Sequence, residues 1–296
     1  MLALREAFAR LGWQAVAWKG SYVDCVDATG RPHQVGLDNL YRRLRREARG
    51  TWADQIADLL GSVPPEAIEP PADLSEVADR LLVRLSQPIK SDNSAIDVWS
   101  QTLVNHQIVA TLVIDYPSSM SYVSAAMIAA SGQSGEFWLR RGIANLLEKS
   151  KPDGLPIVHE ESGLKQGQFG DAYDSSRALL LDELLPGHDE FGFYVIVPSR
   201  DHLLVLPISA PTLPLAPWLR AIANKTHHEM PYPISPELYW VRGGVWRHFV
   251  IQMNGDGVVV QPPPEFAEVL DRLQPSPPDD ATDADLSADD GDPSSS

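Results

Sequence analysis

The sequence predicts an α+β fold built mainly on antiparallel sheet, and three observations lead to that prediction. Short apolar segments occur in pairs joined by tight turns, amphipathic segments with helical spacing follow these pairs, and Gly or Pro clusters separate the segments. With 296 residues and 44% hydrophobic content, the chain can bury either one large core or two smaller ones.

Residues 1–62 are expected to form an N-terminal α/β subdomain. The expected helices are residues 3–11, 37–48 and 51–63, and the expected strands are residues 13–18, 21–27 and 31–37. In the second strand Cys25 shares a face with Val23, opposite Tyr22 and Asp24. Cys25 is therefore expected to be a small core residue and not a nucleophile.

The Pro-rich segment 63–76 is expected to be a linker, which leads into a main α+β domain at residues 77–274. Helices are expected at residues 74–85, 122–132, 134–149 (with Ser134 as N-cap), 171–187, 215–227 and 264–273. Strands are expected at residues 106–116, in a hairpin at 191–209, and three times within 237–261. The segments "FWLRRGIANL" (137–146) and "PWLRAIANK" (217–225) match each other, which suggests repeated strand–strand–helix modules.

Composition bounds the class of protein. A single cysteine excludes an intramolecular disulfide and fits a reducing compartment. No apolar run reaches the roughly 18 residues of a membrane-spanning helix, and the N-terminus lacks the apolar stretch of a secretory signal. The sequence therefore predicts a cytoplasmic protein with no membrane partner.

The net charge of −16 is unevenly distributed. Seven Asp in residues 275–296 contribute −7, and subtracting them leaves −9 for the remaining chain. An acidic body argues against nucleic acid as the main partner. The tail at 275–296 has one Leu and no aromatic residue, so it is expected to be disordered and solubilising.

Three segments in this order resemble the YtpQ family, a bacterial domain of unknown function. They are "GLDNLYRRLR" at 36–45, "GDAYDSSRALLLDELL" at 170–185 and "VIVPSRDHLLVLP" at 195–207. The family's hairpin turn is typically Pro-Asn-Arg-Asp, whereas Ser199 replaces the Asn here. The resemblance implies an intracellular α+β protein and brings with it no catalytic residues.

The segment "THHEM" raises the question of a metal site. A zinc protease helix needs His-Glu-x-x-His, but here Tyr232 stands at the second ligand position and Pro231 breaks the helix. His227 and His228 are expected to be polar residues in the last turn of a helix. A site assembled from His106, His159, His202 and His248 with Asp115 or Glu160 stays open, because the sequence alone cannot show whether distant residues converge.

The candidate binding residues come from the segments that carry the resemblance. Arg200 and Asp201 stand in the predicted hairpin turn, where they can pair with each other, contact the segment around Tyr173, or clamp an anion. Asn39 and Tyr41 of "GLDNLY" are the further candidates. The adjacent basic run at 42–49 can form a solvated surface or bind an acidic group.

The sequence favours a non-catalytic binding protein of adaptor or chaperone type, whose partner is another protein. Its acidic body, its paired strands flanked by helices and the lack of a complete catalytic motif favour this reading, and no cofactor is expected. The alternative is a hydrolase or metal-dependent enzyme with a site built from dispersed His, Asp and Arg residues.

Overall fold

A computed structural model of the chain describes residues 1–19, 22–62, 71, 73–88, 97–116, 120–150, 154–187, 190–254 and 257–273. The predicted tail at 275–296 and most of the predicted linker at 63–76 lie outside these residues. Every strand pairing among the described residues is antiparallel. The predicted α+β class with antiparallel sheet is therefore confirmed.

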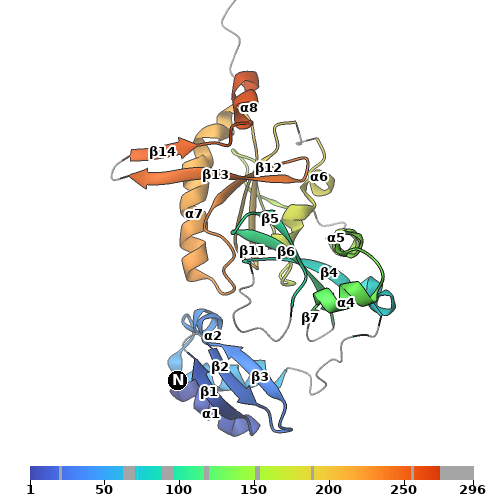
Figure 1. Ribbon diagram of the computed structural model, residues 1–296. Coiled ribbons are helices and arrows are strands. Elements are labelled where there is room, and N and C mark those ends of the chain that lie inside the picture. The colour runs from blue at the N-terminus through green and yellow to red at the C-terminus, as the bar shows by residue number, and fades with distance from the viewer. Residues whose placement is uncertain are drawn as a thin grey trace, which may run out of the picture.

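Residues 1–62, called the N-terminal unit below, contain a three-stranded sheet in the order β1-β2-β3 (Figure 1). The elements are α1 (Leu2–Leu11), β1 (Gln14–Lys19), β2 (Tyr22–Val26), β3 (Pro32–Gly36), α2 (Leu37–Leu44), the 3₁₀ turn η1 (Arg49–Thr51) and α3 (Trp52–Gly61). Phe8, Val23 and Ile56 share one core with Cys25. Cys25 is buried, which confirms it as a core residue, and this burial raises the pKa of its thiol to about 11.

Residues 73–273, called the main unit below, contain two sheets. The larger one has the order β14-β13-β12-β10-β11-β9-β8, and the smaller has the order β4-β6-β5 with β7 paired to β6. The elements of its first half are η2 (Leu74–Arg80), β4 (Leu81–Ser86), β5 (Ser100–Val104), β6 (Ile108–Asp115), β7 (Met120–Tyr122), α4 (Ala125–Ala130), α5 (Gly135–Ser150), β8 (Ile157–His159) and β9 (Leu164–Gln166). Those of its second half are η4 (Ser175–Leu179), α6 (Leu181–Leu184), β10 (Phe193–Ser199), β11 (His202–Pro207), η5 (Ala210–Leu215), α7 (Ala216–Glu229), β12 (Leu238–Arg242), β13 (Val245–Asn254), β14 (Gly257–Gln261) and α8 (Phe266–Leu273).

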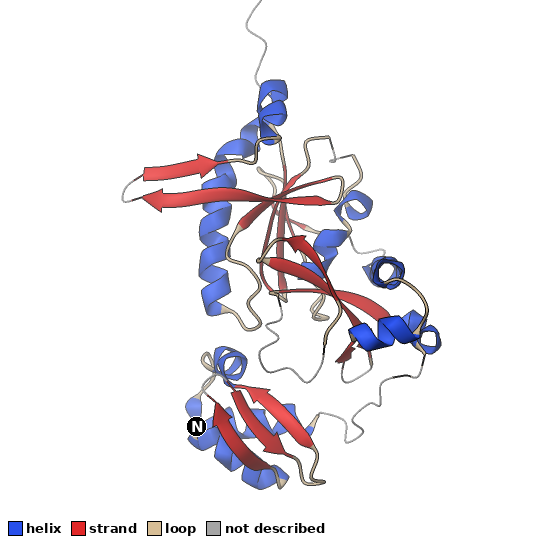
Figure 2. Ribbon diagram, viewed as in Figure 1, coloured by secondary structure: helices blue, strands red, loops and turns tan. Residues whose placement is uncertain are grey.

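Strand β10 is buried along its whole length because both of its faces are covered. Its alternate residues enter different cores, as the two-residue period of a strand requires. Val195 and Val197 pack in a core shared with Val83 of the smaller sheet. Tyr194 and Ile196 pack in a second core with side chains from α7 and α8. Figure 2 shows α7 along one side of the larger sheet and α5 on the other side of the main unit.

Two predicted helices are wrong. The segment predicted as a helix at 74–85 is η2 followed by strand β4, whose Leu81, Leu82, Val83 and Leu85 are all buried. Pairing with β6 along its whole length outweighs local helical propensity. The helix predicted at 171–187 is the 3₁₀ turn η4 and the short helix α6. Strands β5, β7, β8 and β9 were not predicted at all.

Three local predictions hold. His227 and His228 stand in the last turn of α7, which ends at Glu229 just before Pro231. Ser134 caps α5, because its Oγ accepts a hydrogen bond from the Phe137 N–H. The two matching segments lie on α5 and α7. Among the residues described here, no helix is both long and apolar enough to cross a membrane.

Candidate functional site

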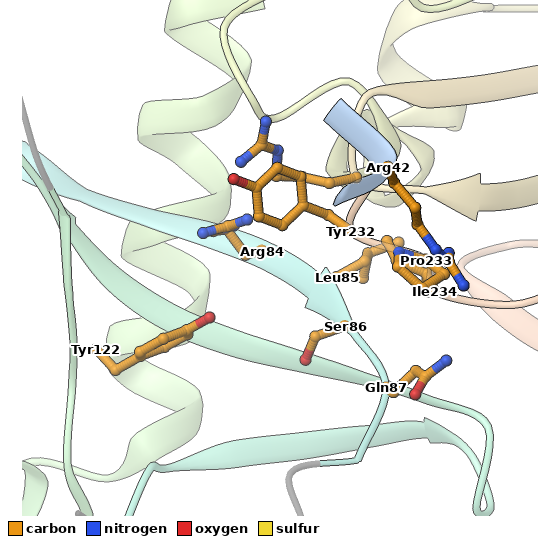
Figure 3. Close-up of a pocket in the computed structure, with 10 residues that line it drawn as sticks. Arg42, Arg84, Leu85, Ser86, Gln87, Tyr122, Tyr232, Pro233 and Ile234 are labelled. Atoms are coloured by element: carbon orange, nitrogen blue, oxygen red, sulfur yellow. The ribbon is translucent and has the colours of Figure 1, made fainter. Parts of the chain in front are cut away.

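A pocket of about 360 Å³ opens at the end of β4, where it meets the β10–β11 turn, segment 232–234 and α2 (Figure 3). It is lined by Arg42, Arg84, Leu85, Ser86, Gln87, Tyr122, Arg200, Tyr232, Pro233 and Ile234. These residues include three arginines and neither Asp nor Glu, so we call this site the basic pocket. Figure 3 shows the side chains of Arg84, Tyr122 and Tyr232 around the same space.

Strand β4 carries Arg84 to the wall of the pocket. Pairing with β6 sets Arg84 opposite Thr111, and the Leu85 N–H on the other edge donates a hydrogen bond of 3.1 Å to Ser176 Oγ. The backbone beneath Arg84 is thus held on both edges. A side chain mounted on a fixed strand is positioned more accurately than one on a free loop.

The β10–β11 turn carries Arg200 into the pocket. Its guanidinium donates two hydrogen bonds to the Asp201 carboxylate, at 2.7 and 2.8 Å, and lies 3.9 Å from the ring centroid of Tyr232. The Arg200 N–H donates to Tyr232 O, and Arg200 O accepts from the Ser175 N–H. Tyr232 has a φ of 54°, a left-handed conformation that is uncommon for a bulky residue, and this conformation holds its ring beneath Arg200.

Arg42 enters the pocket from the N-terminal unit and also contacts the end of α7. Its Nη1 donates to His227 O and Met230 O, both at 3.0 Å, and Arg45 Nη2 donates to Glu229 O at 2.7 Å. The last carbonyls of a helix have no partner within the helix and carry partial negative charge. The basic run is therefore not simply a solvated face: it joins α2 to the C-terminal end of α7, as Figure 1 shows.

Replacing both Arg42 and Arg45 with Gln is expected to release the N-terminal unit from α7. The contacts of the half-buried Arg42 are worth about 1–2 kcal/mol and that of the exposed Arg45 about 0–1 kcal/mol, so their joint loss should shift the docking equilibrium while both units stay folded. Small-angle X-ray scattering should show a larger radius of gyration for the double variant. Arg43→Gln is the control, because Arg43 is on the same helix but makes no hydrogen bond to α7 among the described residues. An unchanged radius of gyration in the double variant would contradict this role.

Arg84 is the arginine of the pocket with the least compensation. Its Nη1 donates to Met120 Sδ at 2.7 Å, and no Asp or Glu among the described residues forms an ion pair with it. The guanidinium of Arg200 is paired with the Asp201 carboxylate and that of Arg42 with helix carbonyls, whereas the partner of Arg84 is the uncharged thioether of Met120. A half-buried guanidinium without a counter-charge is stabilised when an anion binds beside it.

The structure brings together only some of the residues predicted to bind. Arg200 and Asp201 pair with each other, and Arg200 lines the pocket. Tyr173 is 3% exposed in a core, where its hydroxyl donates to Asp115 Oδ1 at 2.8 Å and burial raises its pKa. Tyr41 is exposed on α2 with its ring edge toward Trp52 and does not line the pocket. Asn39 lies on α2, but its side chain is outside the described part of the structure.

The four dispersed histidines do not all converge on one point, although His106 lines a cavity with Glu237, the residue beside His248. His159 Nδ1 bonds Ser162, and His202 Nδ1 bonds Ser199 Oγ at 2.7 Å. His248 Nε2 lies 3.2 Å from Glu237. Within the described ranges, no group of three His, Cys, Asp or Glu residues is arranged to hold a metal ion.

Arg84, Tyr122 and Tyr232 are the charged and aromatic pocket residues that sequence reasoning missed. The available signal was an arginine inside the apolar segment "LLVRLS" at 81–86, where a charged residue needs a reason to be buried. Reading that segment as part of an amphipathic helix gave the arginine an ordinary place on a solvated face. The wrong secondary structure therefore concealed the functional candidate.

The chain was compared with protein-family models, curated proteins and solved structures. No protein-family model, no curated protein and no solved structure matches the chain. The resemblance to the YtpQ family thus stays a prediction, and the candidate site rests on geometry and charge.

Proposed function

We propose that the chain is a non-catalytic protein-binding module of adaptor or chaperone type, and that its basic pocket receives an anionic group of the partner. One observation carries this proposal: the pocket is lined by three arginines and two tyrosines, with no carboxylate among its described lining residues. Guanidinium groups and phenol hydroxyls both donate hydrogen bonds, which is the chemistry that carboxylate and phosphate oxygens require.

The size of the pocket suits one anionic group of a partner better than a whole small molecule. Its volume of about 360 Å³ is near the lower end of ligand sites, which span roughly 300–1,000 Å³. A side-chain carboxylate or a phosphate monoester fits such a space while the rest of the partner stays outside. Placement of the protein in the cytoplasm and kinship with the YtpQ family belong to the same proposal.

Native mass spectrometry of the chain, purified gently from its own host, tests the class of function. A polypeptide that co-purifies at fixed stoichiometry would support the binding module. A stoichiometric metal or small molecule on an otherwise lone chain would overturn it in favour of the alternative, a hydrolase or metal-dependent enzyme.

Replacing Arg84 with Gln is expected to weaken anion binding in the pocket by at least about tenfold, because one charge-assisted hydrogen bond and its charge are lost. Inorganic phosphate is the probe, and the arginine Nε–Hε signals in a ¹⁵N NMR titration report its position. Arg140→Gln removes the same charge from an exposed site on α5 and should leave the affinity unchanged. Equal affinity in both variants would place phosphate elsewhere and remove the basis of the proposal.

A further inference from the structure

A second cavity adjoins the basic pocket. Its volume is about 600 Å³, and it is lined by Gln87, Pro88, His106, Gln107, His227, Ile234, Ser235, Pro236 and Glu237. Gln87 and Ile234 line both sites. The two cavities are therefore neighbours between the end of β4 and the segment that leads into β12, and together they are called the groove below.

Three of the polar side chains that line the second cavity, Gln107, Ser235 and Glu237, pair with neighbouring groups, whereas the two buried ring nitrogens of His227 have no hydrogen-bond partner among the described residues. Glu237 accepts two hydrogen bonds from Arg220, at 2.8 and 2.9 Å, and lies 3.2 Å from His248 Nε2. The hydrogen bond with His248, helped by Arg220, lowers the pKa of Glu237 against the opposing effect of burial. The carboxylate is ionised and paired, so it leaves little net charge in the cavity.

The same network extends to the floor of the second cavity. Gln107 Oε1 accepts a hydrogen bond of 2.8 Å from Tyr239 OH, and Gln107 Nε2 lies 3.3 Å from His248 Nδ1. Ser235 Oγ lies 2.6 Å from the same Tyr239 hydroxyl. Because Glu237 is paired and burial lowers the pKa of His227, the wall carries little net charge and has no strong demand for a charged ligand. Pro88, Ile234 and Pro236 give it an apolar surface. This cavity suits an apolar side chain.

The groove thus changes character along its length, from cationic to neutral and apolar. Strand β4 ends the order of its sheet, and the groove follows the end of that strand. An extended segment places its side chains at regular spacing, so two neighbouring pockets can each take one side chain of the same segment. A single small anion would use only one end of this groove.

Resting on the proposed function, we infer that the partner presents an extended acidic peptide, with a carboxylate side chain in the basic pocket and a nearby apolar side chain in the second cavity. The charge of the first site selects Asp or Glu, and the apolar surface of Pro88, Ile234 and Pro236 in the second selects a residue such as Leu. Gln87 and Ile234 lie beneath the backbone that joins the two side chains.

Fluorescence anisotropy with fluorescein-labelled peptides tests the inference on the full chain. The parent probe is Ser-Glu-Ala-Leu-Ser-Gly, and two further probes have either no Ala or two Ala between Glu and Leu. Each probe is also made with Gln in place of Glu and, separately, with Ser in place of Leu. For the best probe, each of these peptide changes is expected to lower affinity for the unaltered protein by about tenfold.

Variants of the chain assign each peptide side chain to its site. In Arg84→Gln the difference between the Glu and Gln peptides should fall below about twofold, because the partner of the carboxylate is gone. In His106→Asp, a charge on the exposed rim of the second cavity should remove the difference between the Leu and Ser peptides. The left-handed conformation of His106 accommodates Asp, and His159→Asp is the matched control on an exposed strand.

The outcomes separate this inference from the proposed function. In one outcome, the protein binds Glu peptides more tightly than Gln peptides only when Arg84 is present, but the Leu peptides show no advantage over the Ser peptides, or one that His106→Asp does not change. This outcome would overturn the inference of an extended peptide and leave the anion-binding function intact. No Arg84-dependent preference in any probe would overturn both. Both dependences together, in one probe spacing, would establish the groove as a peptide site.

Discussion

Replacing Arg177 with Met is expected to lower the free energy of unfolding by about 3–5 kcal/mol, because the change leaves partly buried carboxylates without their counter-charge. Arg177 is fully buried. It donates two hydrogen bonds to Asp171, at 2.9 and 2.8 Å, and a third to Ser150 Oγ at 2.9 Å. Its guanidinium also lies 3.5 Å from the ring centroid of Phe169. Equilibrium urea unfolding measures the loss.

The Arg177→Met variant also tests the segment that supports strand β4 at the basic pocket. Asp174, 2% exposed, lies 4.0 Å from Arg177 and accepts the N–H groups of Phe169 and Gly170. The same segment continues into Ser176, which holds the edge of β4 beside Arg84. Arg140→Met, at an exposed position, should stay within about 0.5 kcal/mol of the unaltered protein. A comparable loss in both variants would show that Arg177 contributes no more than a surface arginine.

The stability difference between the Arg177→Met variant and the unaltered protein should narrow as the pH falls from 7 toward 3. Burial opposes ionisation of Asp171, but hydrogen bonds and charge from Arg177 outweigh it and lower the pKa of Asp171. In the unaltered protein this carboxylate stabilises the fold above its unfolded pKa of about 3.9, and the contribution is lost as the pH falls through the lower folded value. In the variant, burial without Arg177 penalises the ionised form, and protonation relieves that penalty. A gap independent of pH would exclude this linkage.

The fold class could be predicted from the sequence because it depends on local periodicity. Alternation in the hairpin at 191–209 and in residues 237–261 is visible in the sequence and becomes β10 to β14. Strand β4 could not be recognised in the same way. Its residues continue the three- and four-residue spacing of the preceding turn, and only pairing with β6, more than twenty residues later, makes them a strand.

The candidate site was less predictable than the fold. Arg42, Arg84, Arg200 and Tyr232 come from four distant places in the sequence, and no spacing rule connects them. Arg200 was selected because it stands in the hairpin turn of a segment that carries the family resemblance. Tyr173 was selected from the same family resemblance, yet its hydroxyl serves Asp115 inside a core. A motif identifies residues that matter without saying whether they support the structure or bind a ligand.

Replacing Arg200 with Gln is expected to weaken anion binding in the basic pocket by about a hundredfold, more than any other single change to its lining. The reason is that two effects add. The pocket loses a guanidinium, and Asp201, which pairs with it at 2.7 and 2.8 Å, becomes an unpaired negative charge beside the ligand. The phosphate titration used for Arg84 gives the affinity.

Asp201→Asn is the informative partner of that variant. The carboxylate competes with the ligand for Arg200, so its removal should strengthen phosphate binding by about fivefold while Tyr232 still supports the guanidinium. The double variant should bind more tightly than Arg200→Gln alone, because the stranded charge is gone. If Asp201→Asn instead weakens binding as much as Arg200→Gln does, Asp201 orients the guanidinium for the ligand and does not compete with it. The sign of this one substitution therefore determines whether the Arg200–Asp201 pair is a closed structural bridge that a ligand must open or a preorganised clamp.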